Sequence, residues 1–319
     1  MKNAAVYYST GPLLYCPANR VSVVDSIMKE RFGTGYSLAL CLEDTIGDCH
    51  VAQAEDILIR SLKQIWKAHK ILTFFLPEIF IRVRKASQMS NLLERLGSAQ
   101  AIVSGFIIPK LDLHNIDEYI QMVLQINNPE NKTFYVMPIM ESASIVMPDR
   151  RAGVLYEMKE RLQEIEKYIL NIRVGGNDLC HLFGFRRRCN ESIHRILPIA
   201  NIFADIITVF GMDYVISGPV WEYYGGSGWQ EGLMQELTED RLCGFVGKTA
   251  IHPNQIPFIR QAYAVTQEDL EDARNILGWE TDASSFVSGS IRKKRMNEYK
   301  THTNWARKII YLSEIYGTL

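Results

Sequence analysis

The chain has 319 residues, of which 47% are apolar, and a formal net charge of −1. This length and composition predict a globular protein with one large domain or two smaller ones, and the near-neutral charge argues against a nucleic-acid-binding protein. Apolar runs stay below the roughly 20 residues that a membrane helix needs, and the first residues do not resemble a signal peptide. The six cysteines form no zinc-binding or redox pattern. We therefore expect a cytoplasmic protein that binds neither nucleic acid nor membrane.

Short apolar segments typical of strands alternate with amphipathic segments typical of helices. The strand-like segments lie at 13–16, 36–42, 79–83, 105–108, 134–140, 172–174, 214–217 and 244–251. Eight such units over about 250 residues predict an α/β protein built as a (β/α)8 TIM barrel, whose parallel strands are covered by helices. A doubly wound open sheet would need a glycine-rich first turn, whereas Pro17-Ala-Asn-Arg20 contains no glycine.

The last part of the chain differs from the repeating pattern. Residues 283–290 are rich in serine and resemble a linker, residues 292–295 are all basic, and residues 306–316 are compatible with a helix. The basic tetrad is typical of a solvated face. We therefore expect a barrel domain at residues 1–277 and a C-terminal helical extension at 278–319, which packs on the barrel or on a neighbouring subunit.

Two of the expected strands run into acidic residues. Glu141 follows 134–140 directly, and Asp178 follows the segment that begins at Ile172. Acids at the ends of neighbouring strands lie at the mouth of a barrel, and oxygen ligands are those that Mg²⁺ prefers. Glu141 and Asp178 are thus candidate metal ligands, the alternative being that they cap the following helices.

Arg82 stands between Ile81 and Val83 within an expected strand, where an arginine needs a partner or points into the barrel mouth. A guanidinium there could grip a substrate carboxylate and stabilise an enolate. A structural ion pair with Glu43 or Asp44 is the alternative, and both readings are compatible. Glu43 and Asp44 are adjacent at a strand end, so strand alternation predicts that only one of them faces the site.

These strand ends form an ordered series that resembles the citrate lyase β-subunit-like family, within the aldolase/citrate lyase superfamily. The matching segments span residues 13–256, about three quarters of the chain. They are Leu14-Tyr-Cys-Pro-Ala-Asn-Arg20, Leu40-Cys-Leu-Glu-Asp44, Ile81-Arg-Val83, Gly105-Phe-Ile-Ile-Pro-Lys110, Pro138-Ile-Met-Glu141-Ser142, Gly176-Asn-Asp-Leu179 and Gly244–Ile256.

The resemblance implies a (β/α)8 barrel, Mg²⁺-dependent carbon–carbon cleavage and roles for single residues. It assigns Glu141 and Asp178 to the metal and Arg82 to catalysis. Glu43 and Asp44 would support the metal and the arginine. Asn19, Arg20 and Lys110 lie in matching segments and are expected to bind substrate, the alternative for Lys110 being that it holds a buried carboxylate.

Two departures from the family pattern bear on the substrate. Arg84 stands where the family has asparagine and could recognise an additional negative group. Residues 221–228, with Trp221 and a glycine-rich end, replace an acidic segment and could bind a phosphate and stack on a ring, although an ordinary loop is the alternative. The basic run 186–188 could meet the phosphates of coenzyme A.

The sequence therefore predicts a citrate lyase β-like, Mg²⁺-dependent carbon–carbon lyase, with Mn²⁺ as an alternative ion. Its substrate would be a small hydroxy- or oxo-acid or the coenzyme A thioester of one, cleaved or condensed through a metal-stabilised enolate. Two alternatives stay open: the same scaffold acting on a phosphorylated or nucleoside-like compound or as a thioester hydrolase, and a non-catalytic ligand-binding subunit. We expect a homo-oligomer, either a trimer or a hexamer.

Overall fold

Eight parallel strands form the centre of the computed structural model, which describes residues 4–128, 132–279, 285–290 and 293–319. The sheet order is β7-β6-β5-β4-β3-β2-β1-β8. The ends of the sheet meet where Gly218 bridges Lys248 and the Val246 N–H donates to the Ile216 carbonyl at 2.8 Å, so the sheet closes into a barrel. The strands are β1 (Pro12–Pro17), β2 (Ser37–Cys41), β3 (Ile79–Arg82), β4 (Val103–Ile108), β5 (Tyr135–Met140), β6 (Ile172–Val174), β7 (Ile216–Ser217) and β8 (Lys248–Ala250).

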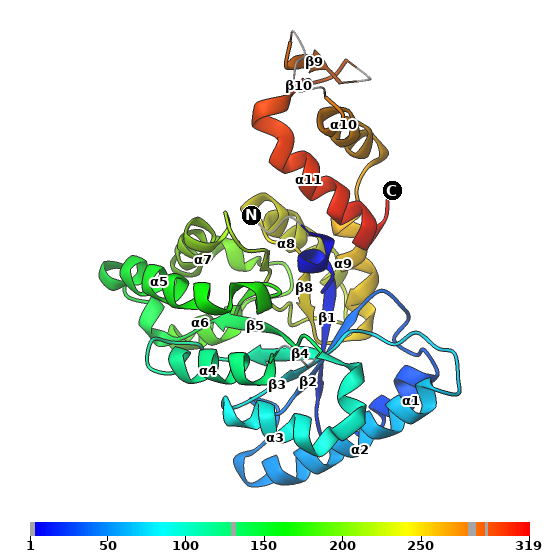
Figure 1. Cartoon of the computed structure of the whole chain (residues 1–319). Helices are drawn as coiled ribbons and strands as arrows, with labels where there is room; N and C mark the ends of the chain where they lie inside the picture. The colour runs from blue at the N-terminus through cyan, green and yellow to red at the C-terminus, as the bar shows by residue number, and fades with distance from the viewer. Residues whose placement is uncertain (1–3, 129–131, 280–284, 291–292) are drawn as a thin grey trace.

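Helices follow the strands and surround the barrel (Figure 1). The predicted (β/α)8 architecture is confirmed, and α9 and α10 follow the last strand of the barrel. The helices are α1 (Val23–Met28), α2 (Val51–His69), α3 (Ser87–Leu96), α4 (Ile116–Ile126), α5 (Pro148–Leu162), α6 (Gly176–Leu182), α7 (Leu197–Phe210), α8 (Trp229–Cys243), α9 (Ile256–Tyr263), α10 (Gln267–Leu277) and α11 (Tyr299–Tyr316).

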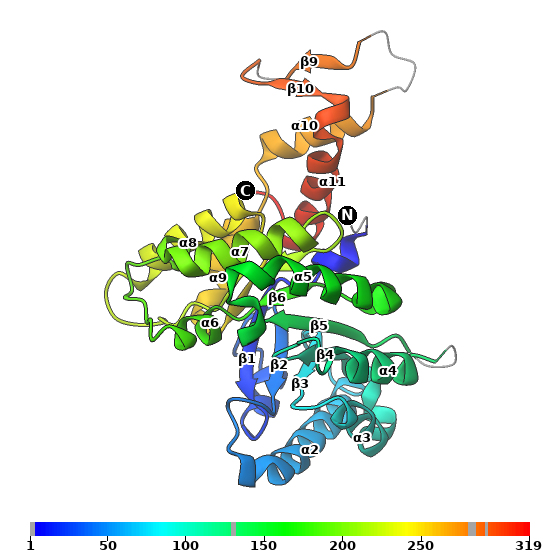
Figure 2. The ribbon, with the colours of Figure 1, turned by 90° about the vertical axis from the view of Figure 1, so that its left-hand side faces the viewer.

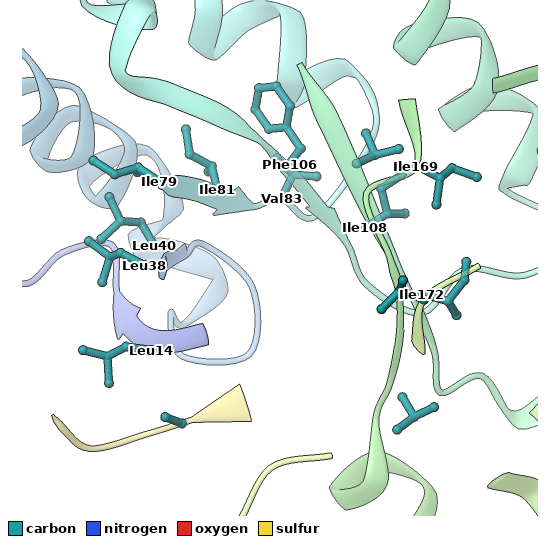
Figure 3. Packing of buried hydrophobic residues seen from close by; sticks show 14 of the residues in the cluster. Leu14, Leu38, Leu40, Ile79, Ile81, Val83, Phe106, Ile108, Ile169 and Ile172 are labelled. Carbon is teal, nitrogen blue, oxygen red and sulfur yellow. The ribbon is translucent and has the colours of Figure 1, made fainter. Parts of the chain in front are cut away.

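Alternation along each strand separates an outer core from the barrel interior. Ile81, Val83 and Ile172 belong to the large apolar cluster between strands and helices, part of which Figure 3 shows. Residues between such positions must point to the other face, into the barrel. Most of that interior is apolar, because a second buried cluster fills it with Leu13, Ala39, Phe80, Ile107, Met137, Ile139 and Leu170.

The C-terminal elements project from the barrel. In both ribbon views α10, α11 and the antiparallel strands β9 (Val287–Gly289) and β10 (Met296–Glu298) stand away from the sheet (Figures 1 and 2). Helix α10 packs against α11. The other end of α11 returns to the barrel, where Tyr311 lies 5.3 Å from the Tyr8 ring. The domain boundary near residue 277 stays a prediction.

A buried ionic cluster joins β8 to α8. The Lys248 Nζ donates to Glu236 Oε1 at 2.8 Å and to Asp240 Oδ2 at 2.7 Å, and all three side chains are fully buried. Arg187 also pairs with Glu236. Every charge in this cluster has an opposite partner, so its role is structural.

None of the helices in the described part of the chain combines the length and the apolar character needed to cross a membrane.

Candidate functional site

A cavity of about 280 Å³ opens where several strands of the barrel end. Polar residues from separate elements line it: Asp44 and Thr45 after β2, Arg82 at the end of β3, Glu141 after β5, and Asp178 in α6. The C-terminal face is where TIM-barrel enzymes place their active sites. The structure therefore brings four of the predicted site residues, Asp44, Arg82, Glu141 and Asp178, to one cavity.

Arg82 holds the acidic residues together. Its Nη2 lies 2.8 Å from Glu43 Oε2, 3.1 Å from Asp44 Oδ2 and 3.1 Å from Glu141 Oε1. These partners come from two different loops, so one guanidinium fixes the relative position of both. The structural ion pair expected for Arg82 is thus present. The Arg82 Nε is buried and has no hydrogen-bond partner among the described residues, which leaves one donor for a ligand.

Lys110 closes the same cluster from the end of β4. Its Nζ lies 2.7 Å from Glu43 Oε1 and 2.8 Å from Asp44 Oδ1, and 4.0 Å from Asp178 Oδ1. Its backbone is in the left-handed region, with φ of 47°, and its N–H donates to Glu141 Oε1 at 3.0 Å. The Lys110 side chain therefore faces acids, and its backbone orients the Glu141 carboxylate.

Glu141 is the most buried of the acids, with 2% of its side chain exposed. Burial raises the pKa of Glu141 to about 8, and the nearby Asp178 adds to the rise, while Arg82 opposes it. The carboxylate fits against Gly175, because a Cβ at that position would lie 2.0 Å from Glu141 Oε2. The glycine thus makes the space that the acid occupies.

The sequence pattern suggested that Asp178 ends a strand, but the structure places it in a helix. Strand β6 stops at Val174, and Asp178 lies in the first turn of α6, whose N-cap is Gly175 and has no side-chain cap. The helix-capping alternative for Asp178 is therefore not what the structure shows. Its side chain is about one third exposed at the cavity, where it faces Glu141 and Lys110.

Of the two adjacent acids, Asp44 lines the cavity and Glu43 does not, although both belong to the charged cluster. Strand β2 ends at Cys41, so the two acids lie in the following loop and strand alternation does not govern them. The loop turns sharply enough for the Asp44 N–H to donate to Glu43 Oε2 at 2.9 Å. Both carboxylates reach Arg82 and Lys110.

The cluster holds more negative than positive charge. Four acidic side chains, those of Glu43, Asp44, Glu141 and Asp178, face two cations, Arg82 and Lys110. Even with Glu141 protonated below its raised pKa, three carboxylates outnumber the two cations. No three His, Cys, Asp or Glu side chains within the described ranges are grouped as ligands of one metal ion. Two carboxylates with water and substrate are nevertheless an ordinary environment for Mg²⁺. The donor set therefore fits a divalent cation held by Glu141 and Asp178.

Arg84 is occupied by the backbone of its neighbouring loop. It donates from Nε to the Leu42 carbonyl at 2.7 Å, and from Nη2 to the carbonyls of Glu43 and Ile46. Its Nη1 meets Asp48 at 2.6 Å. Four of its five N–H groups are thus engaged, and Arg84 is absent from the described lining of the cavity. The side chain fixes the loop that carries Glu43 and Asp44.

Three other expected substrate contacts are not brought to the cavity. Asn19 and Arg20 are exposed after β1 and are absent from its described lining, and the Arg20 Nε donates to Ser22 at 3.1 Å. Trp221 is only 1% exposed and its ring packs beside the Arg187 guanidinium, 5.3 Å away. A buried ring cannot stack on a ligand at the barrel mouth, so Trp221 acts as core.

Tyr15, Arg173 and Thr249 are among the cavity residues that the sequence did not predict. A signal for one of them existed, because Ile172-Arg-Val174 repeats the pattern of Ile81-Arg-Val83, an arginine between apolar strand residues. Tyr15 and Thr249 are ordinary strand residues. The sequence around them does not distinguish a residue that lines a cavity from one that packs in the core.

Known proteins resemble this chain in sequence and in fold. A segment of 68 residues is 31% identical to the citrate lyase subunit beta of Haemophilus influenzae and spans 23% of that protein. The structure of CitE from Mycobacterium tuberculosis with magnesium, acetoacetate and coenzyme A has a TM-score of 0.61 at 18% identity, covering 97% of this chain and 99% of that one.

A second solved structure, the citrate lyase beta subunit of M. tuberculosis with oxaloacetate and magnesium, has a TM-score of 0.51 at 18% identity and covers 82% of this chain and 99% of that one. These structural likenesses show a shared fold. The sequence model of the protein family described as C–C bond lyases of the TIM-barrel fold matches residues 4–318, nearly the whole chain. The protein therefore belongs to the C–C bond lyase family of the TIM-barrel fold.

Proposed function

We propose that the protein binds one Mg²⁺ ion through Glu141 and Asp178 and cleaves or condenses a carbon–carbon bond next to the carbonyl of a small hydroxy- or oxo-acid. The observation that carries this proposal is the acidic excess of the cluster, in which four acidic side chains face two cations at the rim of one cavity. A bound divalent cation would neutralise that excess, act as a Lewis acid and hold the substrate's carboxylate and adjacent oxygen.

Arg82 would stabilise the negative charge that develops on the substrate. The side chain is 8% exposed and lines the cavity, and three carboxylates hold it in place. Its Nε is the donor without a partner among the described residues. A preorganised cation aimed at developing negative charge lowers the activation free energy of the reaction, since no reorganisation is needed when the charge appears.

A coenzyme A thioester is the finer substrate class that we propose. A second cavity of about 310 Å³ is lined by Phe185, Arg186 and Asn177, and Asn177 also lines the acidic cavity. Arg186 is exposed, with 81% of its side chain accessible, and the Phe183 and Phe185 rings stack 5.5 Å apart. An exposed cation and stacked rings beside the reacting end suit a phosphate and a base. The M. tuberculosis structure that contains coenzyme A has the same fold.

Metal binding can be tested by titration calorimetry with Mg²⁺ and with Mn²⁺. We expect binding to the wild type and its loss in Glu141→Ala and Asp178→Asn, because two protein ligands cannot be reduced to one without loss of affinity. Asp25→Asn is the matched control, since Asp25 is an exposed acid paired with Lys29 on α1. Equal Mg²⁺ binding by the wild type and Glu141→Ala would overturn the assignment.

The reaction can be tested with a panel of hydroxy-acids and their coenzyme A thioesters, by following the release of an oxo-acid. Cleavage that requires Mg²⁺ and disappears in Glu141→Ala is the expected result. If metal binds as proposed but no member of the panel is cleaved or formed, the proposed substrate class is wrong.

A further inference from the structure

Arg173 is a fully buried cation inside the barrel. It is the middle residue of β6, and its neighbours Ile172 and Val174 both belong to the outer apolar cluster. Strand alternation therefore directs Arg173 to the barrel interior. The residue is 1% exposed and contributes to the wall of the acidic cavity.

Among the described residues, the guanidinium of Arg173 has a single hydrogen-bond partner, and that partner is neutral. Its Nη2 donates to Thr249 Oγ1 at 2.7 Å, while its Nη1 has no hydrogen-bond partner within the described ranges. None of the salt bridges formed by described residues includes Arg173. Arg82, the other arginine of the cavity, contacts three carboxylates instead.

Burying a cation without an anion is costly, because the lost hydration is not replaced. Burial lowers the pKa of Arg173, opposed only by the hydroxyl groups of Tyr15 and Tyr316, and no carboxylate contributes. Replacing buried charges by well-packed apolar side chains is often neutral or stabilising, so the fold alone does not explain this cation. A ligand that enters the cavity could therefore supply the anion that Arg173 lacks.

The surroundings of Arg173 supply a second donor for such an anion. Thr249 lines the same cavity and already accepts a hydrogen bond from Arg173, so its own O–H is directed elsewhere. Glu141, Asp178 and Arg82 line that cavity as well, and its volume of about 280 Å³ suits a small molecule. One ligand can thus reach both the acidic cluster and Arg173.

We propose that Arg173, assisted by Thr249, binds a second anionic group of the substrate, a carboxylate or a phosphate, while the first carboxylate and its neighbouring oxygen lie at Glu141 and Asp178. The substrate class is then a 2-hydroxy- or 2-oxo-acid that carries another acidic group. This inference rests on the proposed function, since it takes Glu141 and Asp178 as the site of the first carboxylate. A guanidinium binds carboxylate and phosphate oxygens alike.

Three 2-hydroxy-acids that differ at the far end test the inference by titration calorimetry in the presence of Mg²⁺. They are 2-hydroxybutyrate, with a methyl group, malate, with a carboxylate, and 3-phosphoglycerate, with a phosphate. We expect the wild type to bind malate or 3-phosphoglycerate on the order of tenfold or more tighter than 2-hydroxybutyrate, as a charge-assisted hydrogen bond provides. Whichever of the two binds tighter identifies the group.

The variant Arg173→Met should abolish that preference and leave binding of 2-hydroxybutyrate within about threefold. Arg173→Lys should restore part of the preference, and Arg60→Met, an exposed arginine on α2, should change nothing. Thermal unfolding without ligand supplies a readout independent of binding: the Tm of Arg173→Met should equal or exceed that of the wild type, because an unpaired buried charge is removed.

Two outcomes would overturn the inference. If 2-hydroxybutyrate binds in a Mg²⁺-dependent way but neither acidic relative binds more tightly, Arg173 does not select a second anion, and the proposed function survives. If no member of the panel binds and Mg²⁺ itself fails to bind, the proposed function falls and the inference falls with it. A marked loss of Tm in Arg173→Met together with an unchanged preference would show a structural role instead.

Discussion

Arg82 and Arg173 show how one residue type in one local pattern acquires two different roles. Both stand between apolar residues of a strand and both point into the barrel. Arg82 lies beside the loops after β2 and β5, which carry Glu43, Asp44 and Glu141. Arg173 donates only to the Thr249 hydroxyl within the part of the chain that the structure describes. Arg82 orients the acids, and Arg173, as we propose, binds an anionic group of the ligand.

The substitution Arg82→Met separates two roles of that arginine. Removing a cation from an acidic cluster should tighten Mg²⁺ binding, because more negative charge is left for the ion to neutralise. Turnover should nevertheless fall by about 10²- to 10³-fold, as for the loss of one group that stabilises developing charge. Calorimetry and steady-state kinetics measure the two effects, with Arg60→Met as control. Weaker Mg²⁺ binding in Arg82→Met would contradict this view of the cluster.

At the scale of elements, the turn from β6 into α6 shapes the site more than the strands do. Strand β6 has three residues, and Gly175 and Gly176 follow it at once. This turn places Asp178 in the first turn of α6 and leaves room for Glu141 against Gly175. A glycine that allows close approach is thus part of the site although it has no side chain.

The substitution Gly175→Ala tests that contribution. Its Cβ would overlap Glu141 Oε2, at 2.0 Å, and must displace the carboxylate. We expect Mg²⁺ affinity to fall by roughly tenfold or more, since a metal ligand would be moved, as measured by calorimetry. Gly153→Ala is the matched control: nothing lies within 4 Å of its Cβ inside α5, and alanine should stabilise that helix by about 0.5–1 kcal/mol. Unchanged affinity in Gly175→Ala would show that the carboxylate can shift without cost.

At the scale of the whole molecule, α11 links the projecting C-terminal elements to the barrel. It packs against α10 on one side, and its Tyr311 and Tyr316 lie 5.3 Å from the rings of Tyr8 and Tyr263. The chain therefore ties its last helix to its first turn and to α9. That arrangement makes the last helix a contributor to barrel stability. The expected homo-oligomer stays a prediction.

The substitution Leu312→Ala measures this contribution. Leu312 is buried in α11, with 8% exposure, and belongs to the main apolar cluster. Its truncation should lower the free energy of unfolding by about 2–5 kcal/mol, because it removes buried area and leaves a cavity. Denaturant titration checks this value, and Leu319→Ala, at an exposed position, is the control. A change in Leu312→Ala as small as that of the control would show that α11 does not support the barrel.

Local sequence patterns are sufficient to predict the barrel and much of the acidic cluster. Apolar runs and amphipathic stripes are local patterns, and parallel strands bring their carboxyl ends to one face whatever the details. Glu141, Asp178, Arg82, Glu43, Asp44 and Lys110 were therefore predictable as neighbours, and the structure places them together.

Only the tertiary structure decided how the remaining polar residues are used. The Arg84 guanidinium donates to loop carbonyls and Trp221 is buried, although the sequence suggested that both could contact a ligand. Arg173 has the same neighbours in sequence as a paired arginine but no acid within reach among the described residues. The physical reason is that the partner of a charged side chain is set by which loops fold beside it, and those loops lie far away along the chain.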